Sequence, residues 1–303
     1  MRSLQESFQR HYGCSPRKFL MDCRLHLARD TLLKPSVIGK DPFDVEVIWE
    51  VATDAAFAAK DLVAAGTFTA TAALGHSVHV DVTGLDAGTD YHYRFTVGAT
   101  TSPVGRTRTL ADGSPERFAL AIANCQMLES GAYGAYRQMV EEDLDLVVHL
   151  GDYIYEYPGD GKGGRSPAPA RALATLADYR IRYGSYKTDP DLRAAHARFP
   201  FVATWDDHDV ANNYMGDTLP GDPNAADGVA LKTAAYQAWW EHLPVRLDPP
   251  DQAHAGLPVQ PAQRQVAAAV RHVEEEREER AGRRRAAPLA LAPQAGVAVS
   301  AGT

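Results

Sequence analysis

The sequence predicts an α/β fold built on a mostly parallel sheet and preceded by a partial β-sandwich. Residues 41–110 alternate apolar and polar side chains in short runs, which is typical of antiparallel strands. Residues 116–247 alternate short apolar runs with helix-like stretches, which indicates βα units around a parallel sheet. The chain has 303 residues, 45% of them hydrophobic and 23% charged, which suffices for two or three globular domains.

Residues 1–34 are predicted to form two short basic helices. Apolar side chains recur at helical spacing on both sides of a break at the sequence GCSP. In this break Gly13 can end one helix, and Ser15 with Pro16 can begin the next. The segment holds seven Lys and Arg against three Asp and Glu, which leaves −12 for the rest of a chain with net charge −8. This acidic remainder argues against nucleic-acid binding by the whole protein.

Residues 41–110 are predicted to hold four antiparallel strands. β-branched and aromatic residues are frequent in these runs, and turn residues separate them. The expected strands are DVEVIWEVAT, TFTATAAL, HSVHVDVTGL and DYHYRFTVG, at residues 44–53, 67–74, 76–85 and 90–98. A complete sandwich usually needs about seven strands, so we expect only part of one.

Residues 116–247 are predicted to alternate strands and helices. Strands are expected at FALAIANC, LDLVVHLGD and FPFVATWDDHD, and helices over AYGAYRQMVEED, LADYRIRYGSYK and DLRAAHAR. The apolar run LDLVVHL implies that helices bury both faces of the sheet. The Gly-rich stretch PGDGKGGRSPAPA is predicted to be a surface loop.

Residues 248–303 differ in composition from the rest and are predicted to be a disordered tail. They contain no aromatic residue, no Lys and no Ile, so they cannot build a core. Elsewhere, three cysteines without a CxxC pair exclude a disulfide framework, and no run of about 18 apolar residues indicates a membrane span.

Three strand ends in the α/β segment carry residues capable of chemistry. The first predicted strand ends in Asn-Cys-Gln at Cys125, the second in Gly-Asp at Asp152, and the third in Asp-Asp-His-Asp at Asp206–Asp209. Because ligands bind at the carboxyl ends of parallel strands, we expect these side chains to meet at one edge.

Such a set is suited to holding two metal ions that clamp a phosphoryl group. Asp152 follows a glycine turn and can bridge both ions. Cys125 and Tyr155 offer thiolate and phenolate donors to an iron-like ion, and Asp207 suits a harder cation such as Ca²⁺. His208 would then face the phosphoryl oxygens or protonate the leaving group.

Each of these residues also has a simpler interpretation. Cys125 alone is more often a buried small hydrophobe, and the acidic run at 206–209 can be a turn or helix cap. Tyr155 and Tyr157 can be packing or rim residues, and His149 is expected to be a core histidine. Trp239 and Trp240, with Tyr236, are expected to pack in a helix. The metal hypothesis rests on finding GDxxY and WDDHD together, each after a strand.

The motifs ANCQ, LDLVVHLGDYIYEY, FPFVATWDDHDVANNY and YQAWWEHLPVR resemble the PhoD-type alkaline phosphatase/phosphodiesterase family. The resemblance covers residues 41–247, of which 41–110 are similar to the family's fibronectin-III-like N-terminal domain. It implies a metallophosphoesterase-like α/β sheet and hydrolysis of phosphomonoesters and phosphodiesters by a metal-bound hydroxide, with Fe³⁺ and Ca²⁺.

The resemblance also implies a role for each site residue. Cys125, Asp152 and Tyr155 would be iron ligands, with Asp152 bridging to calcium. Asp207 stands where related enzymes place the Asn of a GNH motif, and His208 would face the phosphate. Asn213 is a candidate for calcium or phosphate contact.

Three departures from the family lead to further expectations. Family members continue past the YQAWWEH helix with strands that complete the metal site, so with residues 248–303 in their place we expect an incomplete sheet and weak turnover. Neither the start of the β domain nor the family's twin-arginine export signal is evident, so the chain as written is expected to be cytoplasmic. Residues 1–34 resemble the end of an AraC-type helix-turn-helix regulator, which leaves DNA binding, or an inactive remnant, as alternatives.

Overall fold

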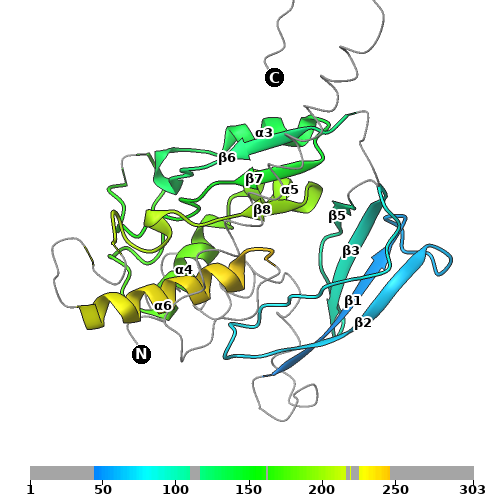
Figure 1. Cartoon of the computed structure of the whole chain (residues 1–303), viewed down its shortest axis with the longest axis horizontal. Helices are drawn as coiled ribbons and strands as arrows, with labels where there is room; N and C mark the ends of the chain where they lie inside the picture. The colour runs from blue at the N-terminus through cyan, green and yellow to red at the C-terminus, as the bar shows by residue number, and fades with distance from the viewer. Residues whose placement is uncertain (1–43, 110–116, 162, 216–218, 220–224, 246–303) are drawn as a thin grey trace, which may run out of the picture.

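Two parts of the chain are seen in the computed structural model, which describes residues 44–109, 117–161, 163–215, 219 and 225–245 (Figure 1). An antiparallel sheet comes first, and an α/β part follows from residue 117. The predicted helices at 1–34 and the predicted tail at 248–303 lie outside the described residues. No helix among the described residues is long and apolar enough to cross a membrane.

The first part is one antiparallel sheet. Its strands are β1 (Val45–Ala52), β2 (Leu62–Ala70), β3 (Asp90–Val97), β4 (Thr100–Thr101) and β5 (Gly105–Arg108). Their order is β2-β1-β3-β4, and β5 also pairs with β3. Val45, Val47, Ala70 and Val97 form its buried cluster, as expected when alternate residues face one side. The described residues of this part hold a single sheet, so the fibronectin-III-like sandwich stays a prediction.

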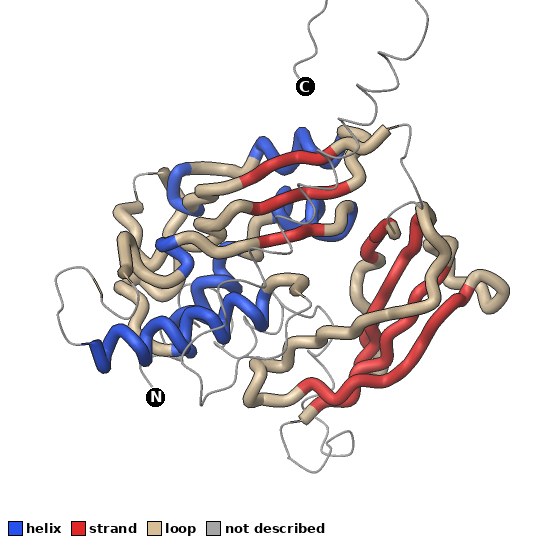
Figure 2. Tube along the Cα trace, in the orientation of Figure 1, coloured by secondary structure: helices blue, strands red, loops and turns tan. Residues whose placement is uncertain are grey.

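The strand predicted at residues 76–85 is wrong, although the alternation that suggested it is real. This segment has no strand ladder and follows an extended path beside the sheet (Figure 2). Val78 packs against the buried cluster of the sheet, whereas the next residue, His79, stacks on Trp240 at 4.0 Å between ring centroids. Nδ1 of His79 also lies 3.2 Å from the carbonyl oxygen of Val245. The segment alternates because its two sides face different parts of the protein.

The α/β part confirms the predicted alternation of strands and helices. Strands β6 (Leu120–Ala123), β7 (Leu146–His149) and β8 (Phe201–Ala203) form a parallel sheet in the order β6-β7-β8. The helices are α3 (Gly134–Glu141), α4 (Leu176–Tyr186), α5 (Pro190–Arg198) and α6 (Ala225–His242), with short 3₁₀ turns η2 (Leu128–Ser130) and η3 (Asp207–Asp209). Figure 1 shows α4 and α6 below the strands.

Local signals explain where two of these helices begin. Thr175 accepts a hydrogen bond from the backbone N–H of Asp178, whose side chain accepts in return, so a capping box starts α4. Asp189 accepts from two backbone N–H groups at the start of α5, with Pro190 as the first helical residue.

Aromatic side chains dominate the core of the α/β part. Trp239, Trp240 and Tyr236 of α6 are buried, as predicted for helix packing. The ring of Trp205, just after β8, meets that of Trp239 edge-on at 4.9 Å. This packing fixes the end of β8, from which the acidic turn η3 starts.

His149 is a core histidine, as predicted, but its hydrogen bonding is incomplete. Its Nδ1 accepts from the backbone N–H of Gly151 at 3.3 Å, and its Nε2 has no partner among the described residues. The side chain is fully buried, and burial lowers its pKa from 6.5 to about 4. The imidazole is therefore neutral in the folded protein near pH 6.

This neutral histidine predicts a loss of stability in weak acid. Below pH 6.5 His149 becomes protonated in the unfolded chain, whereas in the folded chain it stays neutral down to about pH 4. The free energy of unfolding should thus fall by up to about 3 kcal/mol across this window from His149 alone. Urea denaturation between pH 7 and pH 4 measures it. In His149→Asn the number of protons taken up on unfolding should drop by about one. An unchanged number would show that His149 is not the group that is protonated on unfolding.

Candidate active site

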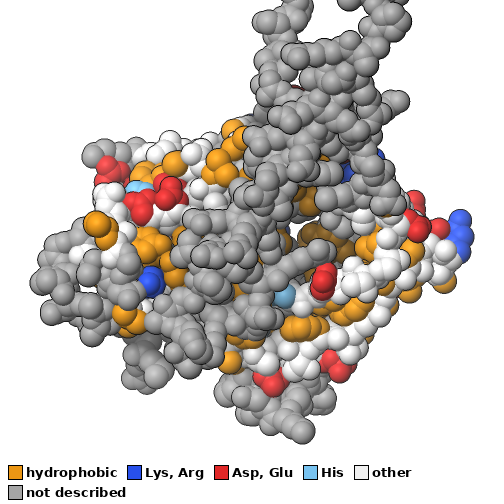
Figure 3. Space-filling view, in the orientation of Figure 1, with side chains coloured by type: hydrophobic (Ala, Val, Ile, Leu, Met, Phe, Trp, Pro, Cys, Tyr) orange, Lys and Arg blue, Asp and Glu red, His pale blue; other side chains and the backbone are white. Residues whose placement is uncertain are grey.

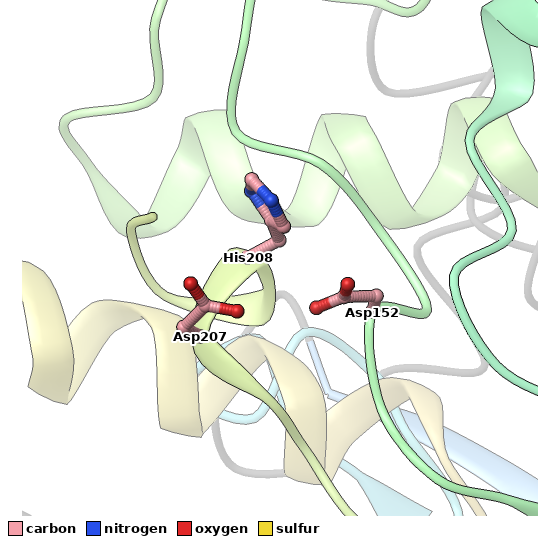
Figure 4. A group of neighbouring side chains, drawn as sticks. All are labelled: Asp152, Asp207 and His208. Carbon is pink, nitrogen blue, oxygen red and sulfur yellow. The ribbon is translucent and has the colours of Figure 1, made fainter. Parts of the chain in front are cut away.

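The predicted site residues meet at the carboxyl edge of the parallel sheet. Cys125 lies after β6, Asp152 lies after β7, and Asp207 and His208 lie in η3 after β8. Ligand atoms of Asp152, Asp207 and His208 all lie within 4.8 Å of one another. Figure 4 shows the two carboxylates facing each other with the imidazole beside them. Figure 3 shows acidic side chains and a histidine gathered on one face of the α/β part.

The backbone at this edge is held in an unusual conformation. Cys125, Asp152 and Asn213 have φ values of 51°, 54° and 56°, and Gly151 has a φ of 105°. Residues other than glycine seldom adopt positive φ, although Asp and Asn tolerate it best. Such strain gathers at functional sites, because the surrounding fold must hold it in place.

Gly151 is required by a close approach between two loops. A Cβ atom on Gly151 would lie 2.5 Å from both the backbone nitrogen and the Cβ of Asp206. These Asp206 atoms belong to or adjoin the backbone and cannot move aside as the end of a flexible side chain can. A larger residue in place of Gly151 would therefore push the loop after β7 away from η3. The Asp152 turn and η3 are therefore in direct contact.

Asp152 is the buried centre of the cluster. Its Oδ2 lies 3.3 Å from the Sγ of Cys125 and 3.1 Å from the hydroxyl of Tyr155, and both groups donate to it. Its Oδ1 is buried without a partner among the described residues. A buried carboxylate oxygen without a hydrogen bond is costly, so a bound cation or a further donor would stabilise this atom.

Asp207 and His208 form the other side of the cluster. One oxygen of Asp207 accepts a hydrogen bond from the backbone N–H of Asn213 at 2.6 Å. The structure thus brings the backbone of Asn213 beside Asp207. Asp152 thus contacts Cys125 and Tyr155 and also lies beside Asp207 and His208, so its carboxylate is shared by all the candidate ligands.

His208 is oriented by Glu156, a contact that the sequence did not reveal. Nδ1 of His208 lies 2.9 Å from Oε2 of Glu156, whose Oε1 accepts from the backbone N–H of Asn212 at 2.7 Å. Because an ionised carboxylate only accepts, Nδ1 carries the hydrogen. The rings of Tyr155 and Tyr157 lie 4.3 Å and 5.3 Å from the His208 ring. Glu156 therefore fixes both the tautomer and the orientation of the imidazole.

Asp209 is the second residue that sequence reasoning undervalued. Its buried carboxylate accepts from the backbone N–H groups of Tyr153, Ile154 and Asp206. Burial raises the pKa of Asp209 to about 7, whereas the donors favour its ionised form. The sequence indicated a turn or cap at this residue, and only its inward orientation distinguishes it from Asp207.

The thiol and the phenol are held protonated in the absence of a cation. Partial desolvation and the nearby Asp152 carboxylate raise the pKa of Cys125, and the same two causes raise the pKa of Tyr155. A bound cation would reverse both effects, because positive charge favours thiolate and phenolate. Cys125 is exposed, so the simpler interpretation as a buried hydrophobe is wrong.

Models of one protein family match both parts of the chain. The PhoD-like phosphatase model matches residues 120–259, and the model of the PhoD-like phosphatase N-terminal domain matches residues 19–111. The chain belongs to the PhoD-like phosphatase family. The first match extends into the predicted tail, and the second begins within the segment predicted to resemble an AraC-type regulator.

Individual relatives agree with this assignment to the PhoD-like phosphatases. Alkaline phosphatase D of Bacillus subtilis (strain 168) is 47% identical over 210 residues, which are 67% of this chain and 36% of the relative. A solved structure described as the structure of PhoD matches with a TM-score of 0.65 and 43% identity, over 74% of this chain and 44% of that chain. This PhoD-like chain thus spans about a third of the length of its curated relative.

Proposed function

We propose that this chain hydrolyses phosphate esters, both monoesters and diesters, at the Asp152 cluster. One observation carries the proposal: Oδ1 of Asp152 is buried and has no hydrogen-bond partner among the described residues, in a carboxylate that the other candidate ligands surround. A bound cation would give this oxygen a partner. Phosphoryl transfer is a reaction that paired cations assist. The family assignment and the relative named alkaline phosphatase D support the same activity.

The donor set fits two cations of different character. Cys125, Tyr155 and Asp152 would hold Fe³⁺, because thiolate and phenolate suit a transition metal. Asp152, Asp207 and the neighbouring Asn213 would hold Ca²⁺, which prefers oxygen ligands. When bound, such ions neutralise charge on a phosphoryl group and lower the pKa of water.

His208 would handle the phosphate oxygens. Its Nδ1 donates a hydrogen bond to Glu156, so its Nε2 would be the atom that interacts with a phosphoryl or leaving-group oxygen. Glu156 thus acts as a positioning residue that sets the ring orientation and tautomer. The aromatic rings of Tyr155 and Tyr157 support the imidazole from the sides.

A hydrolysis assay of the full chain tests the proposal. p-Nitrophenyl phosphate and bis(p-nitrophenyl) phosphate would be supplied to protein loaded with Fe³⁺ and Ca²⁺, and to the same protein after treatment with a chelator. We expect release of p-nitrophenol that chelation abolishes and both cations together restore. Hydrolysis that continues at the same rate after treatment with the chelator would refute the proposal, and so would the absence of hydrolysis with both esters.

Glu156→Gln should slow the reaction without unfolding the protein. The amide can still accept from Asn212, but its NH₂ group cannot take the hydrogen of His208, so the ring loses its tautomer and orientation. We expect kcat to fall about 10–100-fold, as for other partners that orient a site residue, with little change in KM. Steady-state kinetics beside Glu46→Gln, on an exposed position of β1, provide the comparison. Equal rates in both variants would contradict the role of Glu156.

A further inference from the structure

Asp209 links the two loops that carry the candidate ligands. Its Oδ1 accepts from the backbone N–H groups of Tyr153 at 3.1 Å and Ile154 at 3.3 Å, the two residues that follow Asp152. Its Oδ2 accepts from the backbone N–H of Asp206 at 3.0 Å, directly before Asp207. One carboxylate therefore holds the backbone on both sides of the cluster.

A fourth hydrogen bond ties this carboxylate to the helical core. The hydroxyl of Tyr183, on α4, donates to Oδ1 of Asp209 at 3.2 Å. The Asp209 side chain therefore accepts four hydrogen bonds from three segments and is only 1% exposed. A substrate cannot reach it, so it acts through the groups that it holds.

A helix cap alone does not account for this arrangement. In the capping box of η3, the Asp209 side chain contributes only the hydrogen bond that it accepts from the backbone N–H of Asp206. The two bonds to Tyr153 and Ile154 reach across the chain to the other loop and add nothing to the cap. The close approach of Gly151 to Asp206 shows that the two loops are already in contact at this point.

We infer that Asp209 is a positioning residue that sets the separation between Asp152 on one loop and Asp207 with His208 on the other. The inference rests on the proposed function, since it assumes that this cluster binds cations. Its consequence is that loss of the Asp209 carboxylate should weaken cation binding, although Asp209 itself touches neither cation nor substrate.

Asp209→Asn tests the inference in the full chain, because it keeps the shape and removes one acceptor. The new NH₂ group must face a backbone N–H of one loop, so that loop moves. We expect the affinity for Ca²⁺, measured by titration calorimetry, and kcat each to fall about 10–100-fold with KM little changed. Urea denaturation of each variant measures the accompanying change in stability.

Asp178→Asn is the matched control. Asp178 is also a buried carboxylate that accepts backbone N–H groups, those of Ala174 and Thr175, but none of its hydrogen-bond partners belongs to the site. The Asp178→Asn variant should be less stable than the wild type but should bind Ca²⁺ with the same affinity. Unchanged affinity in Asp209→Asn, or an equal loss in Asp178→Asn, would overturn the inference.

Two further outcomes are separated by the same measurements. If Asp209→Asn does not fold, Tyr183→Phe removes one donor to Asp209 and should weaken Ca²⁺ binding about threefold; wild-type affinity in that variant would overturn the inference. If the wild-type chain neither binds Ca²⁺ nor hydrolyses either ester, the proposed function fails, and the inference fails with it.

Discussion

Asp152→Asn is expected to abolish measurable hydrolysis while leaving the fold intact. The amide has nearly the same shape as the carboxylate, and Asn tolerates the φ of 54° at this position. What is lost is the negative charge at the centre of the cluster. Turnover should fall at least about 10³-fold, because a group that stabilises charge in the transition state is removed. Steady-state rates with bis(p-nitrophenyl) phosphate measure this loss.

The effect of cations on stability gives an independent readout for the same variant. Cations that bind only the folded protein raise its melting temperature, so added Fe³⁺ and Ca²⁺ should stabilise the wild type. The increase should be much smaller in Asp152→Asn, because a neutral amide attracts a cation less strongly than a carboxylate does.

Asp143→Asn is the control for the loss of a carboxylate. The Asp143 side chain is 82% exposed and pairs with Arg117. Both residues precede their strands, β7 and β6, whereas the cluster lies after the other ends of these strands. The activity and cation response of Asp143→Asn should match those of the wild type. Substantial turnover in Asp152→Asn, or an equal loss in Asp143→Asn, would show that the cluster is not the active site.

The order of elements in the α/β part could be predicted because its signals are local. Apolar runs of four to eight residues between helix-like stretches mark buried parallel strands, and β6, β7 and β8 lie within the predicted ones. The site followed from the same pattern, since the residues after each strand converge at one edge of a parallel sheet. Chemistry placed at strand ends is therefore visible in a single sequence.

The contacts that hold the site could not be predicted, because they join residues distant in sequence. Glu156 and His208 are 52 positions apart, and nothing near Glu156 marks it as the partner of a histidine. Asp207 and Asp209 are alike in sequence, and only the 3₁₀ turn directs one to the cluster and the other inward. The failed strand at residues 76–85 has a similar cause, since its alternation reflects burial against two different partners.

Arg182 is a buried cation that holds the loop after Asp152. It lies on α4, is fully buried, and donates to five backbone carbonyl groups. Their residues are Tyr155, Tyr157, Ala168, Pro169 and Arg171. The planar guanidinium has five N–H donors in a fixed geometry, so one side chain can satisfy a loop that would otherwise bury its carbonyls unpaired. Two of the acceptors belong to the tyrosines that flank His208.

Arg182→Met is expected to be the most destabilising of these changes. It leaves buried carbonyls without donors, and the free energy of unfolding should fall by more than about 3 kcal/mol. Arg182→Lys should recover only part of this loss, because an ammonium group has three donors. Urea denaturation measures the difference, with Arg137→Met as the comparison. Arg137 is an exposed residue of α3 that pairs with Asp191 of α5. If Arg182→Met unfolds at the same urea concentration as Arg137→Met, the loop does not depend on Arg182 and is held by its other contacts, such as the hydrogen bond from the backbone N–H of Tyr155 to the hydroxyl of Tyr186.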